Sequence, residues 1–557
     1  MENSHPLFTK HADTLDQALT AIAGRTYWSA YPESPSPKVY GEHAAAEGEA
    51  AFRAYLGNDF PLKDQPGITG WVATEQSPFG VDLDVRYPHA DVDALLAAAV
   101  AGMPAWRAAG PRARTGVCVE ILARLHANVF ELANAVHATT GQAFVMAFQA
   151  GAPHAFDRAL EAVAYAYREM TNTPETANWV KPAGKGEPLR MTKSFHVVPR
   201  GVALVIGCNT FPTWNSYPGF FASLVTGNPV VVKPHPRAVL PLAITVKYAR
   251  EVLAEAGFDP NLVTLAAEAP GEGLAKTLAL RPEVRIVDYT GSTEFGDWLE
   301  ANARQAAVYT EKAGVNTIII DSTDDFAGMC RNIGFSLTLY SGQMCTTPQN
   351  ILVPVGGIES DQGHKSLDEV AAGIAGAVGK LTGDPARGVE LTGAIVNDGV
   401  LRRLEKAHDA GEVVLDSATV AHPAYPEAVV RTPLIVKLDA DAEQTYGSEW
   451  FGPISFVIGT DSTEGSLRIF TETVAKKGAL TASAYSTSAD VLDAVEEAAL
   501  LAGVHLSCNL TGGVFVNQSA AFSDFHASGA NPAANASLTD SAYVASRFRV
   551  VQSRRHG

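Results

Sequence analysis

The sequence predicts an α/β protein with two parallel-sheet domains and a small β element near its end. A chain of 557 residues is long enough for two or more domains, since domains average about 150 residues. From Gly201 onward, short β-branched runs alternate with amphipathic segments, and a second series of this kind follows Val315. Strict strand–helix alternation produces parallel sheets through right-handed crossovers. Both predicted domains are therefore Rossmann-like.

Composition and charge limit the functional classes. Apolar residues make up 46% and charged residues 18%, as in ordinary globular proteins. A net charge of −18 argues against nucleic acid or an anionic membrane as a partner. No secretory signal and no apolar span of about 18 residues is visible. Five scattered cysteines and unpaired histidines predict a cytoplasmic protein with neither a disulfide framework nor a metal site.

The first domain begins with a predicted helical layer. The first eighty residues show no regular pattern, but Ala-rich segments in residues 91–170 have apolar residues at helical spacing. The runs GVALVIG, NPVVVKP, LVTLAAE and VRIVDYTGS then read as strands. Between the second and third runs, Leu242, Val246 and Leu253 share one face of a predicted helix.

The second domain repeats this rhythm. NTIIID and NILVPV are strand-like, and amphipathic helical segments follow each of them. We place domain boundaries so that residues 1–309, 310–512 and 513–557 form the first domain, the second domain and a C-terminal tail. In the tail, Phe548 and Val550 alternate with polar residues, which predicts an edge strand that could pair with another chain or a loosely held tail.

Three residues are candidates for chemistry. Cys345 lies between turn-forming residues in SGQMCTTPQN, and Glu311 ends an apolar run directly before a small-residue turn. Asn209 follows GVALVIG, at the sheet edge where open α/β sheets bind ligands. Taken singly, the cysteine is typical of packing and the glutamate of a solvated surface.

Seven motifs, in order and spacing, resemble the aldehyde dehydrogenase superfamily: GCNTFP (207–212), GNPVVVKP (227–234), YTGSTEFG (289–296), TEKAGVN (310–316), GQMCTTPQ (342–349), EWFGP (449–453) and GGVFVN (512–517). The resemblance covers residue 90 to the C-terminus and implies that family's fold, with the tail as an oligomerisation segment of a homodimer or larger homo-oligomer. The details are most similar to the branch that oxidises the CoA-linked ring-cleavage semialdehyde of phenylacetate degradation, 3-oxo-5,6-dehydrosuberyl-CoA semialdehyde.

This resemblance assigns a chemical role to each candidate. Aldehyde oxidation by hydride transfer requires a tetrahedral adduct, which Cys345 would form by attack on the carbonyl. The side-chain amide of Asn209 and the backbone N–H of Cys345 would hold the oxyanion. After hydride transfer to a nicotinamide, a thioester remains on Cys345. Glu311 matches the family's base and would activate the water that hydrolyses it.

The resemblance also implies the cofactor contacts. Gly291 and Ser292 would face the pyrophosphate at a helix N-terminus. Lys233 would approach the adenosine ribose, Glu449 would bind the nicotinamide ribose, and Phe451 would pack beside the nicotinamide.

One departure from the family bears on the choice of cofactor. Many NAD-preferring relatives carry a glutamate three positions after the lysine, where this chain has Pro236 followed by Arg237. Loss of that carboxylate removes repulsion against a 2′-phosphate. We therefore expect NADP to be accepted and preferred over NAD, with Lys233 and Arg237 near the phosphate.

Other readings stay open from the sequence. An acylating dehydrogenase would pass the acyl group to coenzyme A, but such enzymes generally lack the base that Glu311 supplies. A cysteine hydrolase is disfavoured because no histidine falls near Cys345 in a recognisable motif. A non-catalytic binding protein is disfavoured by the joint presence of Cys345, Glu311, Asn209 and Glu449. Asn215 is a second candidate for the oxyanion donor, because GCNTFP is one residue longer than the family norm, and His526 reads as a loop histidine.

Overall fold

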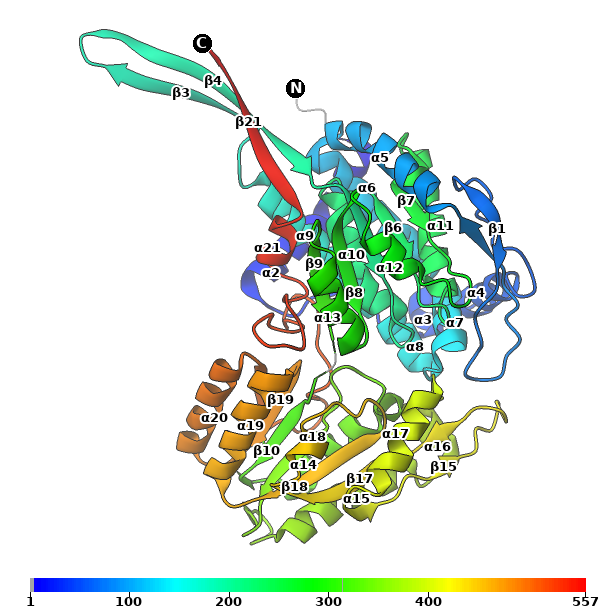
Figure 1. The fold of residues 1–557 in the computed structure, drawn as a ribbon, viewed down its shortest axis with the longest axis vertical. Helices are drawn as coiled ribbons and strands as arrows, with labels where there is room; N and C mark the ends of the chain where they lie inside the picture. The colour runs from blue at the N-terminus through cyan, green and yellow to red at the C-terminus, as the bar shows by residue number, and fades with distance from the viewer. Residues whose placement is uncertain (1–4, 313, 557) are drawn as a thin grey trace.

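The computed structural model describes residues 5–312 and 314–556. Two lobes are visible, each organised around one sheet, and a strand arm projects from the first lobe (Figure 1). The predicted α/β class is confirmed. Within the described residues, no helix combines the length and the apolar character needed to cross a membrane.

The first sheet has the strand order β7-β6-β5-β8-β9, and its pairings are parallel. Buried β-branched side chains fill both faces, as expected when helices cover a parallel sheet on each side. The strands are β5 (Val202–Ile206), β6 (Val230–Lys233), β7 (Val263–Leu265), β8 (Val284–Thr290) and β9 (Ala307–Glu311). Their connecting helices are α10 (Pro212–Val225), α11 (Leu240–Glu255), α12 (Leu274–Ala279) and α13 (Thr293–Asn302), with the 3-10 turn η1 (Pro260–Leu262) before β7.

The second sheet has the order β14-β17-β18-β12-β10-β19-β20, in which β14 alone is antiparallel to its neighbour. Two apolar clusters cover its faces. The strands are β10 (Thr317–Ile320), β12 (Asn350–Pro354), β14 (Glu412–Leu415), β17 (Leu434–Asp439), β18 (Ile454–Thr460), β19 (Thr481–Tyr485) and β20 (His505–Cys508). The helices are α14 (Phe326–Thr338), α15 (Leu367–Thr382), α16 (Pro385–Leu391), α17 (Asp398–His408), α18 (Glu443–Tyr446), α19 (Thr463–Lys477) and α20 (Ala489–Ala502).

The N-terminal region is more regular than its sequence suggested. The predicted helical layer is confirmed as α5 (Val92–Ala108), α6 (Gly110–Ala127), α7 (Val129–Thr140), α8 (Phe144–Gly151) and α9 (Pro153–Thr171). The expectation of no pattern before residue 80 is wrong, since the chain forms α1 (Pro6–Lys10), α2 (Ala12–Gly24), α3 (Pro37–Tyr40), α4 (Ala44–Arg53) and β1 (Ile68–Val72), which pairs with β2 (Tyr87–Ala90). In α2, Leu15, Ala18 and Ile22 are buried at helical spacing.

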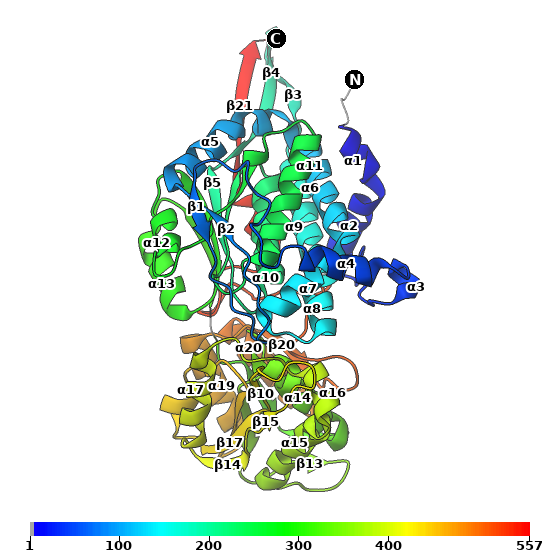
Figure 2. The same cartoon turned by 90° about the vertical axis from the view of Figure 1, so that its right-hand side faces the viewer.

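The chain ends in a strand that belongs to the projecting arm. β21 (Phe548–His556) pairs antiparallel with β4 (Gly186–Pro199), which also pairs with β3 (Thr176–Ala183). The predicted edge strand is therefore present, and its partner within the chain is β4. Figure 2 shows the arm from another side, with β21 beside β4. Small pairs complete the fold: β11 (Ser322–Thr323) with β13 (Glu359–Ser360), and β15 (Thr419–Val420) with β16 (Val430–Arg431).

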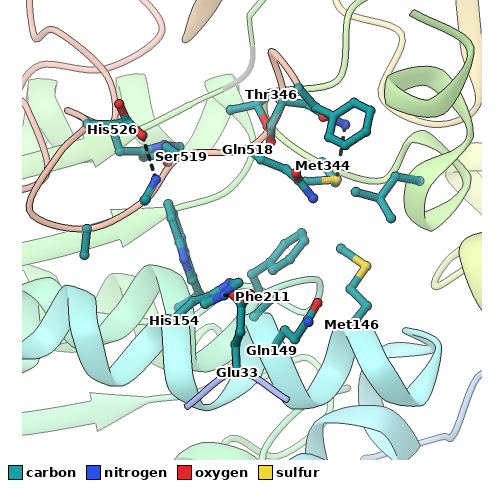
Figure 3. Close-up of a pocket in the computed structure, with 18 of the residues that line it drawn as sticks. Glu33, Met146, Gln149, His154, Phe211, Met344, Thr346, Gln518, Ser519 and His526 are labelled. Atoms are coloured by element: carbon teal, nitrogen blue, oxygen red, sulfur yellow. Dashed lines mark hydrogen bonds and ion pairs between the residues drawn. The ribbon is translucent and has the colours of Figure 1, made fainter. Parts of the chain in front are cut away.

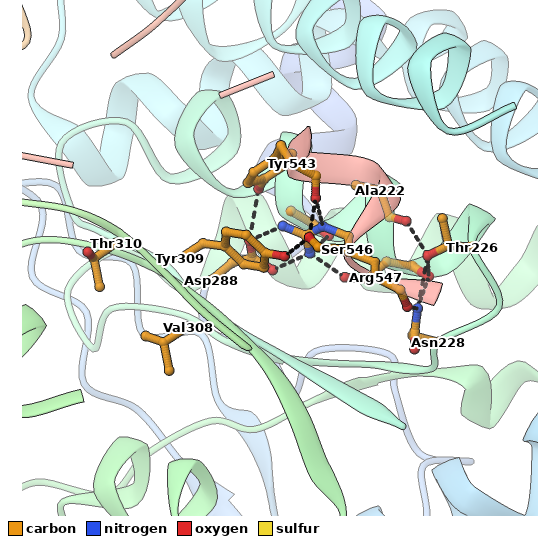
Figure 4. A network of polar contacts seen from close by, with 12 residues as sticks. Ala222, Thr226, Asn228, Asp288, Val308, Tyr309, Thr310, Tyr543, Ser546 and Arg547 are labelled. Atoms are coloured by element: carbon orange, nitrogen blue, oxygen red, sulfur yellow. Dashed lines mark hydrogen bonds and ion pairs between the residues drawn. The ribbon is translucent and has the colours of Figure 1, made fainter. Parts of the chain in front are cut away.

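A buried ion pair fastens the start of the final strand to the first sheet (Figure 4). Arg547, which follows α21 (Ser541–Ala545), donates to both carboxylate oxygens of Asp288 on β8, at 2.7 and 2.6 Å. The Tyr543 hydroxyl donates to the same carboxylate at 2.8 Å. Gly219 on α10 leaves room for this carboxylate, because a Cβ there would lie 2.4 Å from the Asp288 carboxyl carbon.

Replacing Arg547 with methionine should destabilise the protein strongly. Asp288 would keep a buried charge without its ionic partner, and breaking such pairs costs about 3–5 kcal/mol. We expect the thermal unfolding midpoint, measured by circular dichroism, to fall clearly. The matched control is Arg549→Met, since Arg549 is exposed and donates to backbone carbonyls only among the described contacts. Equal midpoints for the two variants would refute the anchoring role of the ion pair.

Candidate active site

The candidate nucleophile Cys345 lies in a turn between α14 and β12. The short 3-10 segment η2 (Leu339–Gly342) precedes it, with Tyr340, Ser341 and Gly342 at positive φ values of 52°, 49° and 63°. Gly342 is required here, because a Cβ at this position would lie 2.4 Å from the Gly452 carbonyl oxygen. The unusual backbone therefore turns the cysteine out of the helix end.

Asn316 holds the cysteine turn against the second sheet. Its Nδ2 donates to the carbonyl oxygens of Cys345 and Thr347, at 2.8 and 3.0 Å. Its Oδ1 accepts the backbone N–H groups of Leu480 and Thr481, at 2.9 and 3.2 Å. The buried amide thus uses its full hydrogen-bonding capacity to fix the height of Cys345 over the strands.

Glu311 reaches the cysteine from the first lobe. It ends β9 and is 1% exposed. Asn215, in the first turn of α10, donates its Nδ2 to Glu311 Oε2 at 3.0 Å. His526 places Nε2 at 3.1 Å from Glu311 Oε1 and 3.9 Å from Cys345 Sγ. The sulfur, the imidazole and the carboxylate, which come from segments distant in the sequence, therefore meet at one point.

The surroundings set the resting charges of this cluster. Burial favours a raised pKa for Glu311, but His526, Cys345 and Arg158 together hold the pKa of the carboxyl below its usual value. Burial, and then the negative Glu311, raise the pKa of the Cys345 thiol well above its usual value. The resting site therefore holds an ionised carboxylate beside a protonated thiol.

The structure brings Asn215, and not Asn209, to the cluster. Asn209 is half-buried beyond β5 and lines neither of the two described cavities that include Cys345, whereas Asn215 lines the larger one. The thiol of Cys208 lies 3.6 Å from Asn215 Oδ1 and orients the amide. The amide in the cluster is therefore supplied by α10 and not by the strand end. We therefore take Asn215 as the candidate oxyanion donor in place of Asn209.

His526 lies in a loop, as expected from the sequence, but its side chain is buried against the cluster. It is 4% exposed and packs edge-on against Trp214, with ring centroids 4.6 Å apart. Its position also removes the sequence argument against a cysteine hydrolase.

The donor atoms of Glu311, Cys345 and His526 lie within 4.8 Å of one another, a spacing that would also suit a metal ion. A metal on the sulfur would block its attack on a carbonyl, so we read the cluster as acid–base machinery.

A cavity of about 530 Å³ opens onto this cluster. His526, Thr346 and Met344 lie on one side, and Phe211, Met146 and His154 face them from the other (Figure 3). Further aromatic and aliphatic side chains line the walls: Tyr27, Trp28, Val145, Trp214, Phe335, Leu339 and Phe515. Its volume and its mixed lining are typical of a small-molecule site.

The carboxyl edge of the first sheet fits a dinucleotide. Ser292 caps α13, whose exposed first turn offers backbone N–H groups to an anion. Gly291 precedes it, packed so closely that a Cβ would lie 2.4 Å from the Tyr289 hydroxyl. Lys233 ends β6 and forms an ion pair with Glu268, which follows β7. This carboxylate beside Lys233 was not considered from the sequence.

The other predicted cofactor residues are divided between two places. Glu449 and Phe451 line a narrow cavity that also includes Cys345, so they face the reacting sulfur. Burial raises the pKa of Glu449 to about 7, against the opposing effect of Arg403. Arg237 donates to the Val396 carbonyl at 3.0 Å, and the Pro236 carbonyl accepts from Thr74. Pro236 and Arg237 are thus held by other segments of the protein.

Fold and site together define an α/β enzyme in which a thiol that lines a cavity lies beside a buried carboxylate. The model of the aldehyde dehydrogenase family matches residues 85–543. The chain belongs to this family and is an enzyme.

Individual relatives are similar over most of the chain. The crystal structure of an NAD-dependent aldehyde dehydrogenase from Burkholderia multivorans is 63% identical, with a TM-score of 0.98 and coverage of 100% of this chain and 99% of that chain. A 1-pyrroline-5-carboxylate dehydrogenase from Thermus with bound NAD shares the fold at 19% identity, with a TM-score of 0.71 and coverage of 96% and 99%. N-succinylglutamate 5-semialdehyde dehydrogenase of Chromobacterium violaceum is 28% identical over 69% of this chain and 74% of its own length.

Replacing Asn215 with alanine should lower kcat by about 10²–10³, the usual cost of removing one oxyanion donor. The matched control is Asn209→Ala, for which we expect less than a tenfold loss because Asn209 lies outside both cavities. Steady-state oxidation of a simple aldehyde measures both. The opposite ranking of the two variants would return the oxyanion role to Asn209.

Proposed function

We propose that this enzyme oxidises an aldehyde to a carboxylic acid through a thioester on Cys345, with a nicotinamide dinucleotide as the hydride acceptor. The observation that carries the proposal is the buried, ionised Glu311 beside the sulfur. A thioester at Cys345 would have a carboxylate base within reach, and a water between them would be activated for hydrolysis. An acylating dehydrogenase would have no use for a base there.

The chain's own residues account for each protein step. The Cys345 sulfur adds to the carbonyl carbon, while the Asn215 amide stabilises the oxyanion. A bound nicotinamide dinucleotide supplies the hydride acceptor. Glu311 then takes a proton from water as the hydroxide attacks the thioester carbonyl, and the carbon–sulfur bond breaks to release the acid. The Cys345 thiol regains a proton and is ready to react again.

We further propose a CoA-linked substrate, in line with the sequence resemblance to the phenylacetic acid degradation protein PaaN and its ring-cleavage semialdehyde. A cavity of about 530 Å³ has room for more than a short aldehyde. Its lining includes the acidic residues Glu33, Asp157, Glu390 and Asp524 but no lysine within the described chain, and Arg158 is paired with Glu161. This charge pattern suits a neutral acyl-pantetheine arm inside, with the CoA phosphates outside.

For the cofactor, we propose NAD in place of the NADP preference expected from sequence. Glu268 forms an ion pair with Lys233, and its carboxylate would be available to the ribose hydroxyls. The same carboxylate would repel a 2′-phosphate. Arg237, the second cation that the sequence assigned to the phosphate, already donates to the Val396 carbonyl.

The remaining sequence expectations stand as parts of this proposal. Residues 1–309 would hold the cofactor, residues 310–512 the nucleophile, and the tail 513–557 would serve assembly of a homodimer or larger homo-oligomer. Support for assembly comes from the exposed edges of β3 and β21 in the arm, where Val180, Val550 and Val551 are exposed. Five free cysteines support a cytoplasmic location.

Glu311→Gln should separate the two halves of the reaction. Without the base, the first turnover should release about one equivalent of reduced cofactor per active site, and later turnovers should be slower by about 10²–10⁴. Stopped-flow absorbance at the reduced-nicotinamide band measures both phases.

The wild-type enzyme should release free acid, from CoA-linked and free aldehydes alike, with the larger kcat/KM for the CoA-linked semialdehyde. Formation of acyl-CoA from free aldehyde and coenzyme A would instead identify an acylating enzyme.

Glu268→Gln should change cofactor affinity. We expect the wild type to bind NAD at least ten times more tightly than NADP, and the variant to close most of that gap because the repelling charge is gone. Isothermal titration calorimetry gives both Kd values without turnover. Glu272→Gln is the control, since Glu272 lies four residues away and pairs with His89. An NADP preference in the wild type would refute the role of Glu268.

A further inference from the structure

His526 joins the two groups that the proposed reaction uses separately. Its Nε2 lies 3.9 Å from the sulfur of Cys345 and 3.1 Å from Oε1 of Glu311. Oε1 is buried and, among the described residues, receives no well-directed hydrogen bond. The other carboxylate oxygen already accepts from Asn215. A buried carboxylate oxygen without a donor, facing an imidazole nitrogen at contact distance, is suited to a proton that arrives at that nitrogen.

We propose that His526 is a further catalytic residue: its Nε2 accepts the Cys345 thiol proton as the sulfur attacks the aldehyde, and Glu311 stabilises the imidazolium that results. This inference rests on the proposed function, in which Cys345 is the nucleophile. It assigns the first proton transfer to the histidine and leaves Glu311 ionised for the later attack by water.

The proton balance follows from the contacts. The S–H bond of Cys345 breaks, the sulfur electron pair forms the bond to the carbonyl carbon, and the proton passes to Nε2. The imidazolium then lies beside the Glu311 carboxylate as an ion pair, which offsets the cost of a buried cation. When the acid leaves, the sulfur is released as thiolate and recovers its proton from Nε2, while the proton that Glu311 took from water passes to solvent and restores the carboxylate. No additional oxidant or co-reactant is needed for this step.

The loop that carries His526 is built to hold the ring in place. The backbone N–H of Phe522 donates to Glu161 on α9 at 3.2 Å, and the Arg25 guanidinium lies 3.8 Å from the centre of the Phe525 ring. Leu538 donates its backbone N–H to the His526 carbonyl at 2.9 Å. With Trp214 against one side of the ring, the imidazole has a defined position opposite the sulfur.

The charged groups around the ring come from several elements of the fold. The charged and titratable groups near the cluster, from the elements packed around it, are Cys208 after β5, Arg158 and Glu161 on α9, Arg25 after α2, Glu449 before β18, and Asp157, Asp524 and His154 along the cavity. Arg158 is paired with Glu161 at 3.0 Å. The carboxylate in direct contact with His526 is Glu311, so a positive charge formed on the ring lies directly beside a negative charge.

The test measures reaction of Cys345 with iodoacetamide in the enzyme without aldehyde or cofactor, from pH 5.5 to 9.5, with alkylation of the Cys345 peptide quantified by mass spectrometry. In the wild type, the His526 imidazole should assist removal of the thiol proton, so the cysteine should react readily at pH 7. In His526→Gln, the buried thiol must ionise alone. We expect its rate at pH 7 to fall at least tenfold, within the usual range for a lost general base, and the inflection of its pH profile to move upward by at least one unit.

The matched control is His505→Gln, because His505 Nε2 contacts the carbonyl of Ala527 in the same loop at 2.8 Å without lining the cavity. It should keep the wild-type profile. His526→Asn, with a thermal midpoint measured for each variant, guards against a loss caused by misfolding and should match His526→Gln. If a folded His526 variant keeps the wild-type pH profile, the inference is wrong even when aldehyde oxidation proceeds. If the wild type shows the expected profile but oxidises no aldehyde, the proposed function fails while the role of His526 toward the thiol stands.

Discussion

The site depends on one buried amide, Asn316. Four hydrogen bonds from this side chain join the Cys345 turn to the start of β19, and its backbone lies five residues beyond Glu311. The nucleophile from the second sheet and the base from the first are therefore tied to one short stretch of chain. Because each buried polar atom of this amide is paired, a shift of the turn would leave donors or acceptors unsatisfied.

Burial then decides how the reactive groups share their charge. A carboxylate and a thiol this close cannot both be ionised cheaply in a water-poor site. The structure keeps the proton on sulfur, surrounds the carboxylate with Asn215 and His526, and lines the approach with aromatic and aliphatic side chains together with four acidic ones. The predicted cofactor edge belongs to the first sheet. Glu449 and Phe451, which the sequence also assigned to the cofactor, reach the same sulfur from the second lobe. Cys345 thus lines two different cavities.

Much of this architecture could be predicted from local sequence patterns. The helical layer and the strands of the first sheet follow apolar periodicity, and Cys345 and Glu311 stand in motifs whose order identifies the family. The helix at Ala12–Gly24 also had a visible signal, with Leu15, Ala18 and Ile22 on one face. That signal was overlooked among the glycines, prolines and aromatic residues that surround it.

Other features depend on chain packing that local patterns do not encode. His526 lies 181 residues from Cys345, in a loop whose path follows from contacts to α9. The choice of Asn215 over Asn209 depends on the contact of α10 with Glu311, 96 residues away in the sequence. Glu268 meets Lys233 because β6 and β7 are neighbours in the sheet. Each is a long-range contact, and neither hydrophobic spacing nor motif order specifies it.

The most direct measurement of the central claim is intact-protein and peptide mass spectrometry of the Glu311→Gln enzyme after one exposure to aldehyde and NAD. The account predicts a mass increase equal to the acyl group, carried by the peptide that contains Cys345. Absence of an acyl adduct while reduced cofactor accumulates, or an adduct on another residue, would contradict the convergence of this thiol and this carboxylate on one aldehyde.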